Sequence, residues 1–303
     1  MVEHPYFQWQ LPEPLSVLDV AVDAETAIRV RRHGNPDGPR LVLSHGNGMA
    51  IDLYYPFWSF LTDTFDLAIY DLRNHGWNSV SSMDNHNIPT LVSDHDLVLE
   101  AVEQEWGQKP QAGVFHSVSA LITLLSPTRC ERYSALVLFD PPICKPGRSH
   151  REFESAAVQA AGFARRRTDR FRYMEEFSDF LPAHPAFRRM VPGAFDLMAL
   201  TTLRPSAGGH GFELRCPREY EAQIVDYASV YGVAVDFESL ACPVKVIGAD
   251  PTMPFSYLPT LDLSDILSVD YDFLPETTHF LQLEKPRECA AALREYLVTL
   301  QMA

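Results

Sequence analysis

Ser117, Asp250 and His279 are residues whose types could together carry out nucleophilic catalysis. A serine hydroxyl becomes a nucleophile when a histidine takes its proton and an acid orients that histidine. Each of the three residues follows a short apolar run, in FHSVSA, VIGADP and ETTHFL. Alone, each has an ordinary explanation as a helix-capping serine, a turn aspartate or a surface-loop histidine. Their order along the chain, serine then acid then histidine, favours an acyl-transfer site.

The segment SHGNGM, residues 44–49, could supply a further part of such a site. Its glycines let the backbone turn sharply, so that the N–H of Asn47 can face the nucleophile. The N–H of Val118, directly after Ser117, would be the second donor. Two such donors stabilise the oxyanion of a tetrahedral intermediate. We therefore predict that Asn47 and Val118 form an oxyanion hole.

The elements that must position these residues alternate between short apolar runs and helical patterns. Strands are predicted in two runs within 17–34 and then at 40–46, 65–76, 112–117, 134–142, 242–250 and 266–280. Helices are predicted at 52–61, 89–106, directly after Ser117, and at 286–300. This alternation is typical of an α/β fold with a mostly parallel, doubly wound sheet. Ligand sites of such sheets lie at the carboxyl ends of the strands, where the candidate residues fall.

Residues 144–235 interrupt this alternation. The region is rich in Arg, Glu, Phe and Ala, and it shows helical patterns without clear strands. We expect an α/β core domain of residues 1–143 and 236–303 with an inserted helical cap of residues 144–235.

Composition limits the classes of partner. Asp and Glu (40) outnumber Lys and Arg (25), and the resulting net charge of -15 argues against a nucleic-acid partner. The start of the chain lacks a basic segment followed by an apolar one, and no apolar run is long enough for a membrane span. The five scattered cysteines indicate free thiols in a cytoplasmic protein. The sequence leaves the oligomeric state open, a homo-oligomer included.

The runs HGNG, YDLRNHG, FHSVSA, VLFDPP, VIGADPTMP and TTHFLQLEKP resemble the α/β-hydrolase superfamily, in its single-cap branch. The segment GGHGFELRCPREYEA, residues 208–222, is similar to one in little-characterised members that include fungal toxin-biosynthesis hydrolases. The resemblance implies roles for the matching positions. They are Ser117 as nucleophile, His279 as base, Asp250 as acid, Asn47 in the oxyanion hole, and His45, Gly46 and His116 against the substrate.

The chain departs from the family pattern in three places. Phe115 and Ser119 replace the two glycines of the family motif G-x-S-x-G. The segment G-A-D-P, which contains Asp250, has one residue fewer between the glycine and the acid than the common family pattern G-x-x-D. In some relatives the acid instead follows an earlier strand, where this chain has Asp140. We favour Asp250, because FDPP is also frequent in relatives whose acid lies later in the chain.

The resemblance implies a serine hydrolase without a cofactor, acting on a small-molecule substrate. Because residues 144–235 are rich in Phe, Leu, Met and Ala, we expect an apolar ester, lactone or thioester. A C–C bond hydrolase of β-diketones would use the same three residues. A weakly active small-molecule-binding protein on a hydrolase scaffold is the alternative outside catalysis.

Two other clusters are expected to be structural. Metal ligands could be sought among His75, Asp84, His86, Asp94, His95 and Asp96, but we expect these residues to brace the fold and predict no metal site. The basic run ARRRTDRFR, whose first arginine is Arg165, favours a solvated helix face over a phosphate site.

Overall fold

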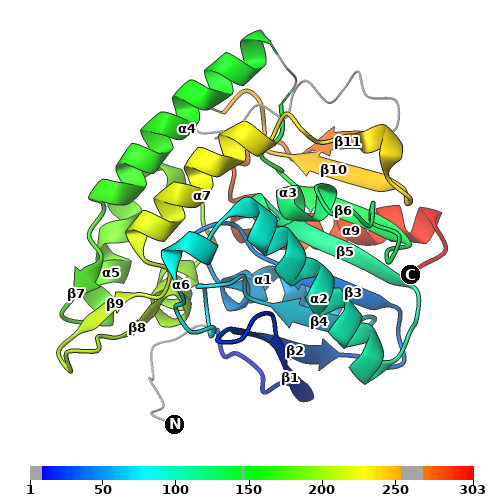
Figure 1. The fold of residues 1–303 in the computed structure, drawn as a ribbon, viewed down its shortest axis with the longest axis horizontal. Coiled ribbons are helices and arrows are strands. Elements are labelled where there is room, and N and C mark those ends of the chain that lie inside the picture. Colours follow the sequence, from blue (N-terminus) through cyan, green and yellow to red (C-terminus); the bar gives the residue numbers. More distant parts are fainter. Residues whose placement is uncertain (1–8, 145–146, 254–268) are drawn as a thin grey trace.

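The computed structural model describes residues 9–144, 147–253 and 269–303. In this part of the chain eight strands form one sheet in the order β1-β2-β4-β3-β5-β6-β10-β11 (Figure 1). The pairs β1–β2 and β2–β4 are antiparallel, and all other neighbours are parallel. The strands are β1 (Ser16–Ala21), β2 (Ala27–Gly34), β3 (Arg40–Ser44), β4 (Asp66–Tyr70), β5 (Gln111–His116), β6 (Ala135–Phe139), β10 (Val244–Gly248) and β11 (Val269–Phe273). The prediction of a mostly parallel α/β sheet is confirmed.

The four central strands, β4, β3, β5 and β6, are buried along their whole length. Successive side chains of a strand point to opposite faces of the sheet. Because both faces are covered, each central strand needs apolar residues on both faces. In β3, Leu41 and Leu43 pack into one hydrophobic core and Val42 packs into the other. The apolar runs of the sequence are therefore strands covered on both sides.

Helices cover both faces of the sheet. One face carries α1 (Tyr55–Trp58), α8 (Leu281–Glu284) and α9 (Pro286–Thr299), and the other carries α2 (Ile88–Trp106) and α3 (Val118–Leu124). The predicted helices at 89–106 and 286–300 correspond to α2 and α9. The helix predicted at 52–61 is instead three short pieces, because 3₁₀ turns at Ile51–Tyr54 and Ser59–Leu61 flank α1.

Residues 147–235 of the region between β6 and β10 contain helices and a small second sheet. We call this region the insertion. Its elements are α4 (Arg148–Arg166), β7 (Arg170–Phe171), α5 (Met174–Phe180), α6 (Ala194–Thr202), β8 (Leu203–Pro205), β9 (Phe212–Leu214) and α7 (Arg218–Tyr231). The strands pair antiparallel in the order β7-β9-β8, and α4 lies alongside α7 (Figure 1). The expectation of helices without strands is thus wrong, because strands of two or three residues are too short to show a periodic pattern.

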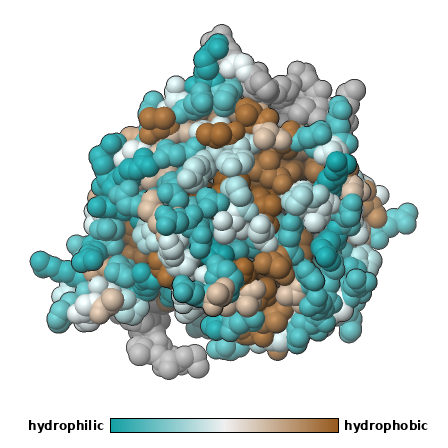
Figure 2. All heavy atoms as spheres, in the orientation of Figure 1, coloured by the Kyte–Doolittle hydropathy of each residue, from teal (hydrophilic) through white to brown (hydrophobic). Residues whose placement is uncertain are grey.

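The surface, the helices and the cysteines bear on further expectations from the sequence. Hydrophilic residues cover most of the face in Figure 2, and hydrophobic residues gather in a band through its middle. Among the described helices, none is both long and apolar enough to pass through a bilayer. No disulfide joins the described cysteines. Residues 1–8 of the N-terminal segment and residues 266–268 of the last predicted strand lie outside the described residues.

Candidate active site

Ser117 lies at the sharp turn between β5 and α3. Its backbone has φ 55 and ψ -123, a conformation that is strained for a residue other than glycine. The Ser117 N–H donates to the carbonyl of Phe139 on the neighbouring strand β6 at 3.0 Å. The Ser119 hydroxyl accepts from the N–H of His116 at 3.0 Å and donates to its carbonyl at 2.8 Å. Ser119 therefore fixes the turn through hydrogen bonds that a glycine at this position could not make.

The ring of Phe115 fits beside this turn because Gly113 leaves room for it. A Cβ at Gly113 would lie 2.5 Å from the Phe115 ring and 2.6 Å from Leu136. The ring packs edge-on against His95 and Tyr133, with centroids 5.3 and 6.0 Å away. The glycine two positions earlier in β5 thus compensates for the missing glycine of the family pattern.

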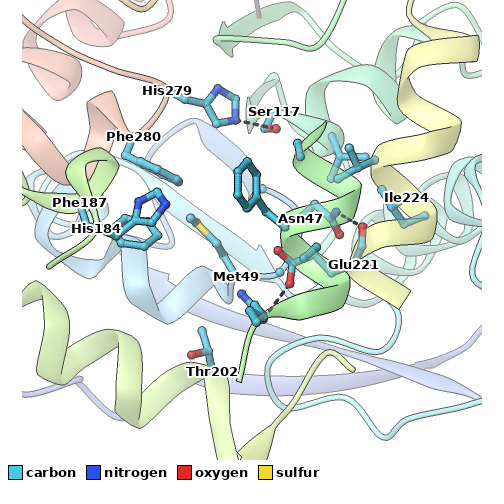
Figure 3. Close-up of a pocket in the computed structure, with 18 of the residues that line it drawn as sticks. Asn47, Met49, Ser117, His184, Phe187, Thr202, Glu221, Ile224, His279 and Phe280 are labelled. Atoms are coloured by element: carbon cyan, nitrogen blue, oxygen red, sulfur yellow. Dashed lines mark hydrogen bonds and ion pairs between the residues drawn. The ribbon is translucent and has the colours of Figure 1, made fainter. Parts of the chain in front are cut away.

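His279 connects Ser117 to a buried carboxylate. Its Nε2 lies 3.0 Å from Ser117 Oγ, and its Nδ1 lies 2.6 Å from Asp140 Oδ2 (Figure 3 shows the first contact). Because a carboxylate only accepts, His279 Nδ1–H donates to Asp140 and Nε2 is left to accept from Ser117. Asp140 is completely buried, and its Oδ1 accepts the N–H of Ala249 at 3.1 Å. This geometry suits proton transfer from Ser117 to His279.

The carboxylate that contacts His279 is therefore Asp140, whereas the predicted acid, Asp250, lies elsewhere in its loop. Both carboxylate oxygens of Asp250 serve the local loop. One accepts the N–H and hydroxyl of Thr252 at 2.8 and 2.7 Å, and the other accepts the N–H of Glu276 at 2.6 Å. These bonds, those from Thr252 first, lower the pKa of Asp250. Asp250 holds the loop that leads to His279 and does not contact its ring.

The predicted oxyanion residues lie next to Ser117. Asn47 and Val118 border the same cavity as Ser117. A Cβ at Gly46 would lie 3.3 Å from the Ser117 Cβ, so the loop after β3 closely approaches the turn. Within the described residues, no hydrogen bond occupies the backbone N–H of Asn47 or of Val118. Their role as an oxyanion hole remains a proposal that this arrangement supports.

A chain of hydrogen bonds joins the loop after β3 to the backbone of His279. The Gly46 N–H donates to Tyr54 Oη at 3.2 Å, and Tyr54 Oη lies 2.7 Å from His116 Nδ1. His116 Nε2 lies 2.8 Å from the His279 carbonyl oxygen. Since a carbonyl only accepts, His116 donates from Nε2, so its Nδ1 accepts from the Tyr54 hydroxyl. Burial keeps the pKa of His116 well below the usual value, consistent with a neutral ring.

The residues predicted to contact substrate differ in their surroundings. Gly46 and His116 border the cavity, although both ring nitrogens of His116 are engaged as described. His45 is completely buried and bonds to the Gly46 carbonyl and the Leu72 N–H. Burial lowers its pKa to about 4. His45 does not border the cavity, and its ring holds the loop after β3 from behind.

A cavity of about 410 Å³ lies between the sheet and the insertion, and it reaches Ser117 and His279. Figure 3 shows Met49, Phe187 and Phe280 along one side. Further apolar side chains that border it from the insertion are Phe153, Ala156, Ala157, Ala160, Phe163, Phe171, Phe177, Phe180, Leu181, Met198 and Ile224. Phe163 and Phe180 are also 62% and 66% exposed, so they lie where the cavity meets solvent. Ser117 is thus reached through a largely apolar chamber.

The charged pair Arg167 and Glu221 was missed as a candidate for the site. Arg165 matches the predicted solvated face, since it pairs with Asp226 at the surface. Arg167, two residues later, instead borders the cavity beside Glu221. Helix α4 ends at Arg166, so the side chain of Arg167 points in a different direction from those of the helix. The sequence gives no sharp signal for where this helix ends. Glu221 does fall within the segment 208–222 that resembles family members.

The residues considered for a metal site have other partners. Asp94 pairs with Arg73 at 2.7 Å, and His95 contacts Tyr70. His75, His86 and Cys216 each place one donor atom within 4.8 Å of the others. However, His75 Nε2 accepts the N–H of Gly48 at 3.0 Å and Nδ1 bonds to the Arg73 carbonyl at 2.8 Å. Both nitrogens of His75 are therefore used, Nε2 in holding the loop after β3 and Nδ1 in holding the loop after β4.

Solved structures share this architecture over nearly the whole chain. E-2-(acetamidomethylene)succinate hydrolase superposes with a TM-score of 0.71 at 16% identity, covering 93% of this chain and 99% of that one. The thioesterase domain from the curacin biosynthetic pathway superposes with a TM-score of 0.68 at 16% identity, covering 94% of this chain and 99% of that one. The enol-lactonase from Burkholderia xenovorans LB400 superposes with a TM-score of 0.68 at 17% identity, covering 92% of this chain and 99% of that one. At these identities the similarity shows the fold alone.

No curated protein matches the chain by sequence. The model of the alpha/beta hydrolase family matches residues 41–292, which include the turn at Ser117, Asp140 and His279. The match covers well over half of the chain, and the chain belongs to the alpha/beta hydrolase family.

Proposed function

We propose that the protein is a serine hydrolase that cleaves an ester, lactone or thioester by way of an acyl-enzyme. The observation that carries the proposal is the continuous contact from Ser117 Oγ through His279 to Asp140, open to a largely apolar cavity. A serine, a histidine and an acid in this geometry form the arrangement used for acyl transfer on several unrelated folds.

In the proposed reaction, Ser117 Oγ attacks the substrate carbonyl carbon while His279 Nε2 takes the hydroxyl proton. Asp140 orients the imidazole and stabilises the imidazolium that forms. The N–H groups of Asn47 and Val118 hold the oxyanion. His279 then gives its proton to the leaving alcohol or thiol. A water molecule, deprotonated by His279, attacks the acyl-enzyme, and the released Ser117 recovers the proton.

The cavity supports a small-to-medium apolar substrate. Phe, Ala, Leu and Met side chains from the insertion form most of its wall, and burial of apolar substrate groups against them favours binding. We propose on this basis that the insertion acts as a cap. Solved structures of similar fold include a hydrolase, a thioesterase domain and an enol-lactonase, names that are consistent with cleavage next to a carbonyl.

Turnover of p-nitrophenyl butyrate and hexanoate tests the proposal. Replacement Ser117→Ala removes the nucleophile, so kcat should fall by a factor of about 10⁴ or more. Ser134→Ala, an exposed serine, is the matched control and should leave kcat unchanged. Turnover that survives Ser117→Ala would refute the proposal. Cleavage of a β-diketone but of no ester would redirect it to C–C bond hydrolysis, which uses the same residues.

A further inference from the structure

Arg167 and Glu221 place an ion pair in the wall of the largely apolar cavity. Arg167 follows the end of α4, and Glu221 lies in the first turn of α7. Arg167 Nη2 is 2.7 Å from Glu221 Oε2, and the side chains are 33% and 17% exposed. Both residues border the cavity. Charges in apolar surroundings cost free energy, so their place in this wall calls for an explanation beyond stability.

Glu221 is also attached to the loop that carries the proposed oxyanion donor. Asn47 Nδ2 donates to the Glu221 carbonyl oxygen at 2.7 Å (Figure 3). A Cβ at Gly48 would lie 2.8 Å from the Glu221 carboxyl carbon. The carboxylate therefore packs directly against the loop after β3, close to where the reacting carbonyl would be held.

The Glu221 carboxylate has unused capacity to accept hydrogen bonds. Among the described residues, no hydrogen bond reaches its buried Oε2, although Arg167 Nη2 lies 2.7 Å from that atom as an ion pair. Arg167 Nε has no hydrogen-bond partner either, so the two groups do not form a bidentate fork. Burial raises the pKa of Glu221, although the neighbouring Arg167 acts to lower it. A ligand that fills this part of the cavity would leave Oε2 without a hydrogen bond unless it brought a donor of its own.

We propose that Glu221 binds a hydroxyl group of the substrate, so that the enzyme prefers hydroxylated esters or lactones over their unsubstituted parents. The inference rests on the acyl-transfer function proposed for Ser117. A hydroxyl donates to Glu221 and leaves its own oxygen for the Arg167 guanidinium. An ammonium group would place a second cation beside Arg167, and a carboxylate would be repelled by Glu221. A neutral hydroxyl satisfies both side chains.

Matched esters test this inference. The first series is methyl octanoate with its 3-, 6- and 8-hydroxy derivatives, and the second is octyl acetate with its 8-hydroxy derivative. The two series place the hydroxyl on the acyl side or on the alcohol side of the bond. At least one hydroxylated ester should exceed its parent in kcat/KM by about 10- to 100-fold, as for a hydrogen bond to a charged group. Methyl 8-aminooctanoate should show no such advantage.

Two sets of variants separate recognition from folding. The double variant Arg167→Met with Glu221→Met removes both charges together, so no uncompensated charge stays behind. In it the preference for the hydroxylated ester should fall to within about threefold of unity, while Glu221→Gln should lower it only in part. The control is Arg165→Met with Asp226→Met. That exposed pair joins the same two helices and should keep the preference of the wild type.

The outcomes distinguish this inference from the function on which it rests. If the parent esters are cleaved and a fluorophosphonate labels Ser117, but no hydroxyl improves kcat/KM, the hydroxyl site is wrong and the serine hydrolase stands. A preference that persists in the Arg167/Glu221 double variant also contradicts the site. If the wild type cleaves no ester and Ser117 is not labelled, the acyl-transfer proposal fails and the hydroxyl site fails with it.

Discussion

At the scale of the residue, the orientation of His279 depends on Asp140. Asp140 directly follows strand β6, which lies between β5 and β10 in the sheet. Its carboxylate therefore stands between Ser117, after β5, and the loops that follow β10. Asp250 follows β10 itself, but in its short loop the carboxylate turns back onto Thr252 and the N–H of Glu276. Two aspartates at the same edge of the sheet thus have separate tasks.

Asparagine substitutions at these two aspartates should differ strongly in effect. In Asp140→Asn, an amide that donates to His279 Nδ1 would stabilise the wrong tautomer, and kcat for ester hydrolysis should fall by roughly 10⁴-fold. Asp250→Asn weakens only the contacts within its loop, so the fall in kcat for this variant should stay below about 100-fold. Steady-state kinetics give the ranking, and urea unfolding of each variant checks that the fold is kept. The reverse ranking would restore Asp250 as the acid.

At the scale of the element, four connections meet through Tyr54 and His116. They are the loop after β3, the turn Ile51–Tyr54, the end of β5 and the segment before α8. Hydrogen bonds run from the Gly46 N–H to Tyr54, on to His116, and from His116 to the His279 carbonyl. Burial favours a neutral His116, which donates to the His279 carbonyl and accepts from the Tyr54 hydroxyl. We infer that these bonds hold the proposed oxyanion loop and His279 in register.

Removal of the Tyr54 hydroxyl should therefore impair the chemical step more than binding. In Tyr54→Phe the Gly46 N–H loses its acceptor and His116 Nδ1 loses its donor, each a cost of about 1–3 kcal/mol for a buried group. We expect kcat to fall about tenfold or more with KM nearly unchanged. Tyr55→Phe is the control, since no described residue hydrogen-bonds to the Tyr55 hydroxyl. A rise in KM at constant kcat would instead indicate a binding role for Tyr54.

At the scale of the whole molecule, the sequence predicted the alternating elements but not their lateral order. The apolar runs place β3, β4, β5, β6 and β10 correctly, because buried parallel strands are apolar on both faces. The order of strands in the sheet decides whether Asp140 or Asp250 reaches His279, and periodicity carries no information about it. Ser117 and His279 were found because they follow strands in the expected order. Arg167 was not predicted to border the site, because the direction of its side chain depends on where α4 ends.

The burial of many histidines makes the stability of the whole molecule depend on pH. Burial is the main cause of a lowered pKa for His33, His45, His75, His86, His95 and His116. The unfolded chain takes up protons near the ordinary pKa of about 6.5, and the folded chain does so only at lower pH. Stability is therefore fully present above pH 6.5 and is lost as the pH falls toward the folded values, about 4 for His33 and His45.

Urea unfolding at pH 7.5, 6.5 and 5.5 measures this dependence. Each histidine should contribute up to about 1 kcal/mol of loss between pH 6.5 and 5.5. The raised pKa of buried carboxyl groups such as Glu221 and Glu284 acts in the opposite direction and reduces the sum. We expect the free energy of unfolding to fall by several kcal/mol over this range. A value that stays constant down to pH 5.5 would show that these rings can be protonated in the folded state.

The central claim is that Ser117 is a nucleophile activated by His279 and Asp140. Incubation of the folded protein with a fluorophosphonate, followed by peptide mass spectrometry, tests it most directly, because the probe needs an activated serine and no knowledge of the substrate. A single adduct on the peptide that contains Ser117 is expected, absent from urea-unfolded protein and strongly slowed in His279→Ala. An adduct on another serine, or an unlabelled Ser117 in the folded protein, would contradict the account.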